Sequence, residues 1–243
     1  MTTCAILYPG HSAEDDYPLA ERLLRESGVD VSLPVVGVHS GPTDHTVEAL
    51  LHLGRPELLS AGAQKAAAHA PDAVMWACTS GSFVFGTDGV REQAAGLAAA
   101  AGVRASSTSL AFLGALRALG VSRVAVSATY PEVVARRFRD LLADAGVEVV
   151  DMSAHDVPSG EDAGRLAPEA VMELAGSART DGAEALLVPD TALHTIALLP
   201  RLEQEIGLPV LTANQVTVFD ALAMLGVQIP VAPTLGTLFS GGR

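Results

Sequence analysis

Cys78 is the residue of this sequence best placed to act as a nucleophile. It follows an apolar run and precedes Thr79, Ser80 and Gly81, so hydroxyls and successive backbone N–H groups are expected around its sulfur. The positive end of a helix lowers the pKa of a thiol from about 8.5 toward neutrality and also binds anions. We therefore expect a thiolate and a carboxylate site in one turn. The alternative is a buried structural cysteine, which is the commoner fate of free cysteine.

A second polar turn, with Asp190 and Thr191, occupies the equivalent position of an internal repeat. Residues 72–107 and 184–214 both follow the order strand, polar turn, helix, strand, polar turn. Ligands of doubly wound sheets bind beyond the carboxyl ends of the strands, so Cys78 and Asp190 are expected to face each other across a cleft. Two alternatives stay open, because β-α units can resemble a repeat by chance and Asp at such a turn is a good helix N-cap.

The elements that position these turns follow from the hydrophobic pattern. Short apolar runs ending in Gly, Pro, Ser or Thr alternate with stretches of helical period, which is typical of an α/β protein with doubly wound parallel sheets. The pattern predicts helices over most gaps, including 110–119 and 131–145, and strands at 4–8, 29–38, 73–77, 103–106, 124–127, 147–151, 185–188 and 210–211. We expect a first lobe at 1–113, completed by 219–243, and a second lobe at 114–218.

Composition restricts the function classes. A net charge of −13 argues against nucleic acid or anionic membrane surfaces, which require clustered Lys and Arg, but local N–H and hydroxyl donors can still hold a small carboxylate. No run reaches the roughly 18 apolar residues of a membrane span. The two cysteines, with Cys4 expected in the core, form no disulfide framework. These features predict a cytoplasmic protein in a reducing compartment.

No motif indicates a metal or a cofactor. The seven histidines form no HExxH, the cysteines no CxxC, and the glycines neither GxGxxG nor a phosphate-binding loop. We therefore expect chemistry that uses side chains alone.

Several motifs resemble one known group of enzymes. Residues 77–82 read ACTSGS, residues 106–110 read SSTSL, residues 113–120 read LGALRALG, and residues 124–130 read VAVSATY. In this order they are similar to maleate cis-trans isomerases and arylmalonate decarboxylases, two branches of the aspartate/glutamate racemase superfamily. The resemblance extends from the first strand to Asn214 and beyond. It implies two pseudo-symmetric lobes with the active site in the cleft between them, and a homodimer as a family-level expectation.

The resemblance also implies a set of substrate-binding residues. Tyr130 matches the family's phenol that binds the substrate carboxylate, and Ser12 stands where maleate isomerases carry an Asn. Asn214, which is also a good turn residue, resembles a polar residue of the second lobe. The expected carboxylate-binding set is Pro9, Ser12, Thr79, Ser80, Tyr130, Thr191 and Asn214. The acidic run Glu14 to Asp16 is expected to be a solvated helix start, because it would otherwise repel a dicarboxylate.

The sequence departs from the family pattern at Asp190, where racemases and maleate isomerases carry a second cysteine and decarboxylases carry their only one. An aspartate exchanges protons less readily at neutral pH than a thiol, which weakens a two-thiol racemisation and the lone-cysteine decarboxylation. Nucleophilic addition by Cys78 requires one thiol only. Asp190 would then act as an acid or hold a cationic or amide group.

These residues favour a cofactor-independent isomerase of maleate or a related unsaturated acid, acting through a covalent Cys78 adduct. A racemase or a malonate-type decarboxylase is the nearest rival. A catalytically silent carboxylate-binding protein is the rival of a different class, because one of the two paired thiols is absent.

Overall fold

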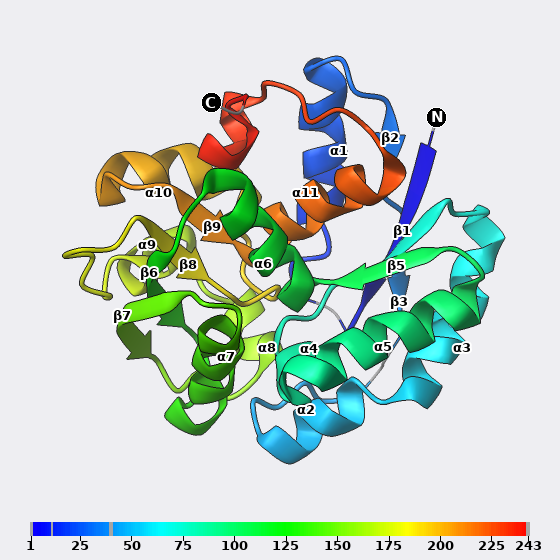
Figure 1. The fold of residues 1–243 in the computed structure, drawn as a ribbon, viewed down its shortest axis with the longest axis horizontal. Coiled ribbons are helices and arrows are strands. Elements are labelled where there is room, and N and C mark those ends of the chain that lie inside the picture. Colours follow the sequence, from blue (N-terminus) through cyan, green and yellow to red (C-terminus); the bar gives the residue numbers. More distant parts are fainter. Residues whose placement is uncertain (1, 11, 39–40, 242–243) are drawn as a thin grey trace.

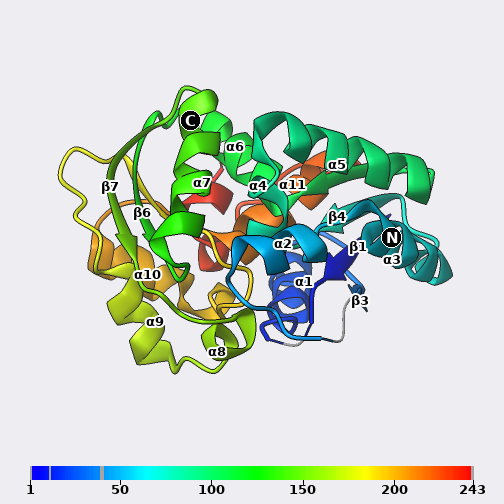
Figure 2. The same cartoon turned by 90° about the horizontal axis from the view of Figure 1, so that it is seen from below.

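The computed structural model describes residues 2–10, 12–38 and 41–241. Two parallel β-sheets stand side by side, each covered by helices (Figure 1), which confirms the predicted α/β class. Turned by 90°, the first sheet with α3 and α5 still lies apart from the second sheet with α7, α9 and α10, and α6 and α11 lie between them (Figure 2).

The first sheet has the order β2-β1-β4-β5, with β3 continuing the line of β2 along β1. Its strands are β1 (Thr2–Tyr8), β2 (Val31–Ser32), β3 (Val35–Gly37), β4 (Ala73–Trp76) and β5 (Arg104–Ser107). One continuous strand was predicted at 29–38, and this is wrong. Pro34 has no N–H to donate to the ladder and divides the run, although its carbonyl still accepts from the Ile6 N–H at 2.9 Å.

The second sheet has the order β7-β6-β8-β9, again with all pairs parallel. Its strands are β6 (Arg123–Ala128), β7 (Glu148–Ala154), β8 (Ala185–Val188) and β9 (Val210–Thr212). The predicted strands at 124–127, 185–188 and 210–211 are confirmed within one residue at each end. The polar turns that carry Cys78 and Asp190 therefore follow the carboxyl ends of β4 and β8, as the sequence pattern predicts.

Eleven α-helices are found in the described part of the chain. They are α1 (Asp16–Glu26), α2 (Val47–Leu53), α3 (Pro56–Ala66), α4 (Ser80–Phe83), α5 (Gly86–Ala101), α6 (Thr108–Leu119), α7 (Glu132–Asp144), α8 (Gly160–Gly164), α9 (Pro168–Ala175), α10 (Leu199–Ile206) and α11 (Ala213–Leu225). The predicted helices at 110–119 and 131–145 correspond to α6 and α7, and Pro131 is the N-cap of α7. None is long and apolar enough to cross a membrane, within the residues described.

Strand alternation divides the core into layers. Along β1, Cys4 and Ile6 pack into the large cluster that includes α1, α6 and α11, whereas Ala5 and Leu7 point to the opposite face, against α3. The large cluster continues into the second sheet through Val124 and Val126 of β6. The two sheets are therefore joined by one hydrophobic core, and α6 runs through residue 113 without a break.

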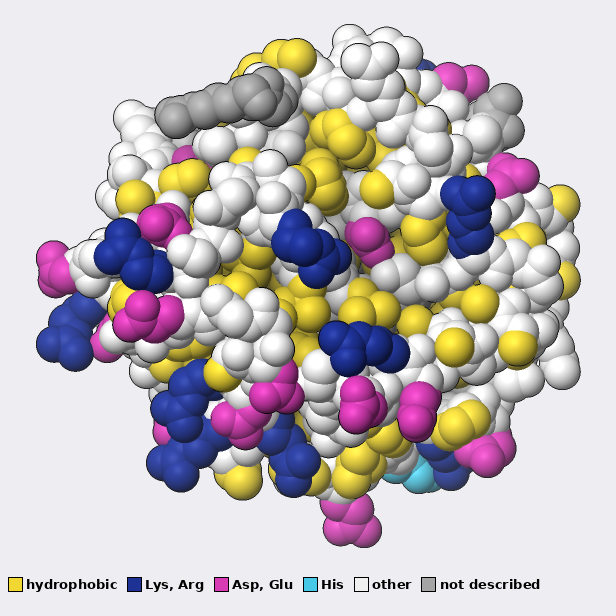
Figure 3. All heavy atoms as spheres, viewed as in Figure 1, with side chains coloured by type: hydrophobic (Ala, Val, Ile, Leu, Met, Phe, Trp, Pro, Cys, Tyr) yellow, Lys and Arg dark blue, Asp and Glu magenta, His cyan; other side chains and the backbone are white. Residues whose placement is uncertain are grey.

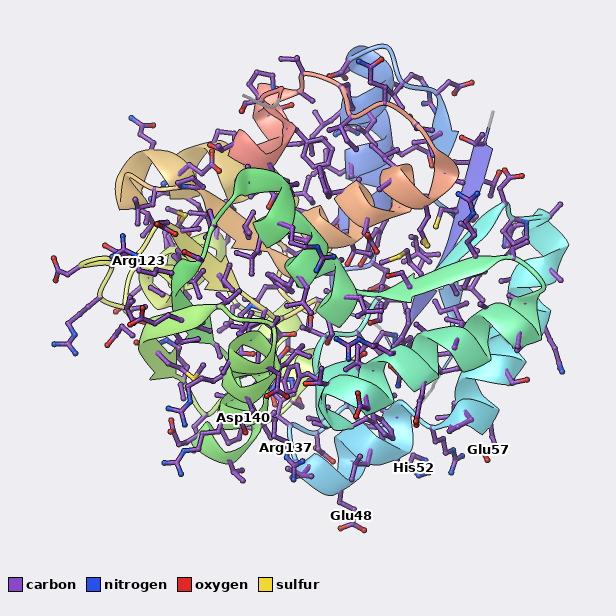
Figure 4. All side chains as sticks on the ribbon, in the orientation of Figure 1. Glu48, His52, Glu57, Arg123, Arg137 and Asp140 are labelled. Atoms are coloured by element: carbon purple, nitrogen blue, oxygen red, sulfur yellow. The ribbon has the colours of Figure 1, made fainter. Side chains whose placement is uncertain are left out.

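Polar contacts also join the two sheets at their periphery. Arg137 of α7 donates to the Val84 carbonyl at the end of α4, at 3.2 Å, and the stick view shows Arg137 and Asp140 together on the side of α7 nearest α2 (Figure 4). On the face seen in Figure 3, Lys and Arg side chains are interspersed with Asp and Glu. This face does not present a continuous basic surface.

Candidate active site

Cys78 lies at the carboxyl end of β4, two residues beyond Trp76, and is 4% exposed. The Gly81 backbone N–H donates to its sulfur at 3.3 Å, and the Ser80 hydroxyl lies 4.0 Å away. A Cβ at position 81 would lie 2.9 Å from the sulfur. The absence of a side chain at Gly81 therefore allows the backbone to approach the thiol.

The surroundings of Cys78 correct one prediction from the sequence. Burial raises the pKa of the Cys78 thiol from 9.0 to about 12; the Gly81 N–H and the Ser80 hydroxyl lower it, and the Asp190 charge raises it further. The helix that follows is α4, with four residues, so only one turn of peptide dipoles lies near the sulfur. Desolvation outweighs these donors, and the free protein holds a neutral thiol at neutral pH.

Asp190 lies beyond the carboxyl end of β8 and is 4% exposed. Its Oδ2 accepts from the buried Thr129 hydroxyl, and its Oδ1 accepts from the Ala192 N–H at 2.9 Å. The alternative of a helix N-cap is wrong, because a turn follows Asp190 and α10 begins only at Leu199. The carboxylate is instead held by a hydroxyl and by its own turn.

Cys78 and Asp190 line the same pocket, here called the Cys78 pocket. The space between its lining atoms is about 320 Å³ when the open entrance is included. Only about 20 Å³ of this is wide enough for the centre of a water molecule. The lining consists of Tyr8, Pro9, Ser12, Thr43, His45, Leu50, Leu53, Cys78, Ser80, Gly160, Asp190, Thr191 and Ala192. The free cleft is narrow, and no Lys or Arg of the described chain lines it.

Six of the residues singled out in the sequence come together in this pocket: Pro9, Ser12, Cys78, Ser80, Asp190 and Thr191. Thr79 and Tyr130 lie directly behind the lining. The Thr79 side chain is fully buried; its hydroxyl makes no hydrogen bond of full geometry among the described residues, but it lies close enough to the Tyr130 hydroxyl to lower the pKa of Tyr130. The Tyr130 hydroxyl donates to the Pro189 carbonyl at 2.6 Å, and burial, followed by the Asp190 charge, raises the pKa of Tyr130.

Asn214 lies outside the pocket lining, in a buried polar cluster. Its Nδ2 donates to Asp16 Oδ2 at 2.8 Å and to the Leu193 carbonyl at 3.1 Å, and its Oδ1 accepts from the Tyr17 hydroxyl. Asp16 is 3% exposed, so the expectation of a solvated acidic run is wrong for this residue. The backbone N–H groups of Thr195 and Ile196 also bind this carboxylate.

Sequence reasoning missed Tyr8 and His45 as lining residues. Tyr8 ends β1, at the sheet edge where ligands bind, so its position was a usable signal. Its hydroxyl donates to the Thr191 carbonyl at 2.8 Å and accepts from the Ala13 N–H. His45 comes from the loop before α2, and no local pattern indicates that this loop reaches the pocket. Within the residues described, no three His, Cys, Asp or Glu side chains gather as a metal site.

Two parallel α/β sheets joined by one core, with a buried thiol beyond the carboxyl end of one sheet, match the two-lobed arrangement of the aspartate/glutamate racemase superfamily, whose second cysteine is replaced by Asp190 here. The sequence model of the arylmalonate decarboxylase family matches residues 56–239. The chain therefore belongs to the arylmalonate decarboxylase family.

Individual relatives are found in the same branch. The chain is 26% identical over 132 residues to a maleate isomerase of Geobacillus stearothermophilus, covering 54% of this chain and 52% of the relative. It is 28% identical over 145 residues to the arylmalonate decarboxylase of Bordetella bronchiseptica, covering 58% and 59%. These matches span only about half of the curated relatives' length.

The fold extends further than the sequence matches. A Nocardia farcinica maleate cis-trans isomerase, solved as a cysteine-to-serine variant with a covalently bound succinylcysteine intermediate, is 22% identical to this chain. It has a TM-score of 0.88 and covers 98% of each chain. At this identity the likeness shows that the fold is shared.

Proposed function

We propose that this protein is a cofactor-independent cis-trans isomerase of maleate or a related small unsaturated carboxylic acid, acting through covalent addition of Cys78. The observation that carries the proposal is the Cys78 pocket itself. It offers one thiol, with a carboxylate in place of a second thiol. Addition and elimination at one carbon require one nucleophile, whereas two-base racemisation requires a matched pair.

The reaction begins with a neutral thiol, because burial raises its pKa. The thiol proton passes to the Asp190 carboxylate, and the sulfur adds to one carbon of the double bond. The electron pair of that bond moves toward the adjacent carboxyl group. The former double bond is now a single carbon–carbon bond, and the molecule rotates about it. The electron pair then returns to re-form the double bond, the carbon–sulfur bond breaks, and the proton returns to the sulfur. The product is the trans acid.

Neutral donors around Cys78 can stabilise the charge that develops on the carboxyl group. The Ser80 hydroxyl lines the pocket on the thiol side, and Ser12 and Thr191 line it elsewhere. The Thr79 hydroxyl can add a further donor, because a buried hydroxyl that is poorly paired in the free protein gains most from a new acceptor. The homology to maleate isomerases, one of which forms a succinylcysteine, supports this assignment.

The test compares wild type with Cys78→Ser, and uses Cys4→Ala as the control for loss of a buried cysteine. Each protein is incubated with maleate and with unsaturated, malonic and amino acids, followed by intact-mass measurement and proton NMR in deuterated water. We expect a trans product and an adduct mass that depend on Cys78 and not on Cys4. Release of carbon dioxide, or deuterium exchange without an adduct, would instead identify a decarboxylase or a racemase. Tight binding without turnover would identify a carboxylate-binding protein.

A further inference from the structure

The loop before α2 crosses from the first lobe to the second and fixes His45 at the Cys78 pocket. Thr43 accepts through its carbonyl from the Gly160 N–H at 2.9 Å, and the His45 N–H donates to the Pro158 carbonyl at 2.8 Å. Asp44 pairs with Ser159 in an antiparallel bridge. His45 is therefore held by backbone contacts with the second lobe, and its side chain is only 4% exposed.

The contacts of the His45 ring fix its tautomer. Nδ1 lies 2.8 Å from the Val157 carbonyl. A carbonyl oxygen can only accept, so Nδ1 carries a hydrogen and the neutral ring has its lone pair on Nε2. The ring also packs edge-on against Tyr130, with centroids 4.9 Å apart.

The lone pair on Nε2 faces Asp190. The distance from Nε2 to Asp190 Oδ2 is 3.9 Å, which is an ion-pair contact rather than a hydrogen bond. The other partners of this carboxylate, Thr129 and the Ala192 N–H, are neutral. Within the described chain, His45 is thus the group that can place a positive charge beside Asp190.

This arrangement matters when an anion enters. A carboxylate ligand adds negative charge next to Asp190, in a pocket whose described lining includes no Lys or Arg. Like charges at short range in a buried site oppose binding unless one is neutralised. A proton on Nε2 converts the neutral His45 ring into an imidazolium, whose positive charge then balances the negative charge of the Asp190 carboxylate.

We propose that His45 and Asp190 act as one proton-binding pair, and that entry of a small carboxylate into the Cys78 pocket is accompanied by uptake of one proton from solvent at His45. His45 is then a positioning residue that sets the charge of the pocket and makes it selective for anions. The ligand class rests on the proposed function, whereas the proton coupling does not depend on turnover.

Other ionisable groups surround the pair. They are Cys78 and Tyr8 in the pocket lining, Tyr130 against the ring, and Asp44, Asp156 and Asp162 on the segments that hold the loop. Burial raises the pKa of Cys78 to about 12 and also raises that of Tyr8 and Tyr130, so these three stay neutral near pH 7. Asp44 and Asp156 are exposed, and Asp162 accepts from the Ser159 hydroxyl at 2.7 Å. Histidine is the side chain whose charge ordinarily changes in this range.

The experiment is calorimetric titration of maleate, succinate and malonate into the Cys78→Ser protein, which cannot form an adduct. Titrations in buffers of different ionisation enthalpy report the protons taken up. We expect net uptake of protons on binding, and a Kd that rises with increasing pH by at most about tenfold per pH unit.

Substitutions then assign the effect to the pair. In the Cys78→Ser background, His45→Gln should weaken binding about tenfold or more at pH 7, since one charge is no longer neutralised, and uptake should fall toward zero. Adding Asp190→Asn should restore binding and make it independent of pH, which also shows that the pocket stays folded. His69→Gln, at an exposed position, is the matched control.

Two results would overturn the proposal: binding without proton uptake or pH dependence, or no binding of any of the three acids. Failure of the proposed function gives a different result. In that case the wild type forms no trans product, although anion binding still takes up a proton at His45.

Discussion

The backbone nitrogen of Gly81 lies 3.3 Å from the sulfur of Cys78, and the space that a side chain at residue 81 would need is taken by neighbouring atoms. A Cβ at position 81 would lie 2.9 Å from the sulfur and 3.2 Å from Cζ2 of Trp76. Gly81 therefore gives the thiol its closest hydrogen-bond donor and its space at the same time.

Gly81→Ala should reduce both stability and activity. Overpacking against the buried sulfur should lower the free energy of unfolding by about 1–3 kcal/mol, and displacement of the N–H should lower kcat. Gly96→Ala is the control, since nothing lies within 4 Å of a Cβ at this position. It should raise the free energy of unfolding by about 0.5–1 kcal/mol, because Ala is favoured over Gly inside a helix. Denaturant unfolding and initial rates give both values. Unchanged kcat in a destabilised Gly81→Ala protein would contradict a role for this N–H.

The reactivity of Cys78 should rise steeply with pH. Because burial raises its pKa to about 12, the rate of iodoacetamide labelling should increase about tenfold per pH unit and show no plateau below pH 10. Asp190→Asn should accelerate labelling, because the Asp190 charge is one cause of the raised pKa. Mass analysis assigns the label to Cys78 or Cys4. A plateau near neutrality would show instead that the thiolate forms readily.

The same shift has a consequence for stability. The folded thiol has a pKa above its ordinary 9.0, so the folded state binds this proton more tightly than the unfolded state. Its contribution to stability is complete below about pH 9 and is lost as the pH rises toward 12. Cys78→Ser should weaken this alkaline loss of stability, which unfolding curves between pH 8 and pH 10 can measure.

Thr79→Val should stabilise the free protein and impair the reaction. The Thr79 hydroxyl is buried with only a weak contact to the Tyr130 hydroxyl, so its replacement by a methyl group should remove a desolvation cost of at most about 1–3 kcal/mol. If the hydroxyl binds the substrate carboxyl group, KM rises or kcat falls in the same variant. Thr79→Ser should restore activity. A stabilised variant with wild-type kinetics would remove Thr79 from the substrate-binding set.

Asn214→Ala should act on stability rather than on substrate binding. The Asn214 amide donates to the buried carboxylate of Asp16, whose pKa is raised by burial and lowered by this hydrogen bond among others. Its loss should cost about 1–3 kcal/mol, and more at pH 7.5 than at pH 4.5, because the charged carboxylate needs the donor. Gln64→Ala, on the exposed face of α3, is the control. An effect confined to KM would instead support the prediction that Asn214 binds the substrate.

Much of the architecture follows from local pattern. Buried strands such as β8 are continuous apolar runs, and polar turns after them mark the sheet edge where Cys78 and Asp190 lie. Pro34 could have predicted the break between β2 and β3, because its missing N–H is visible in the sequence. The direction of the Cys78 pKa could not be predicted, since it depends on burial by distant segments.

His45 shows the same limit at the site. Its approach to Asp190 depends on contacts between residues more than 100 positions apart in the chain, such as that with Val157. The spacing of hydrophobic residues along a helix or a strand carries no information about such a contact. The lobe boundary near Leu113, the cytoplasmic location and the homodimer stay predictions.

The position of α11 affects how the protein can be made. This helix follows the last strand of the second sheet, yet it packs against α6, α1, β4 and β5. A ribosome therefore releases the strands of the first sheet long before the helix that covers them. At about 5–20 residues per second, this apolar face waits on the order of ten seconds for its cover. During synthesis, the half of the molecule that holds the thiol is translated first and completed last.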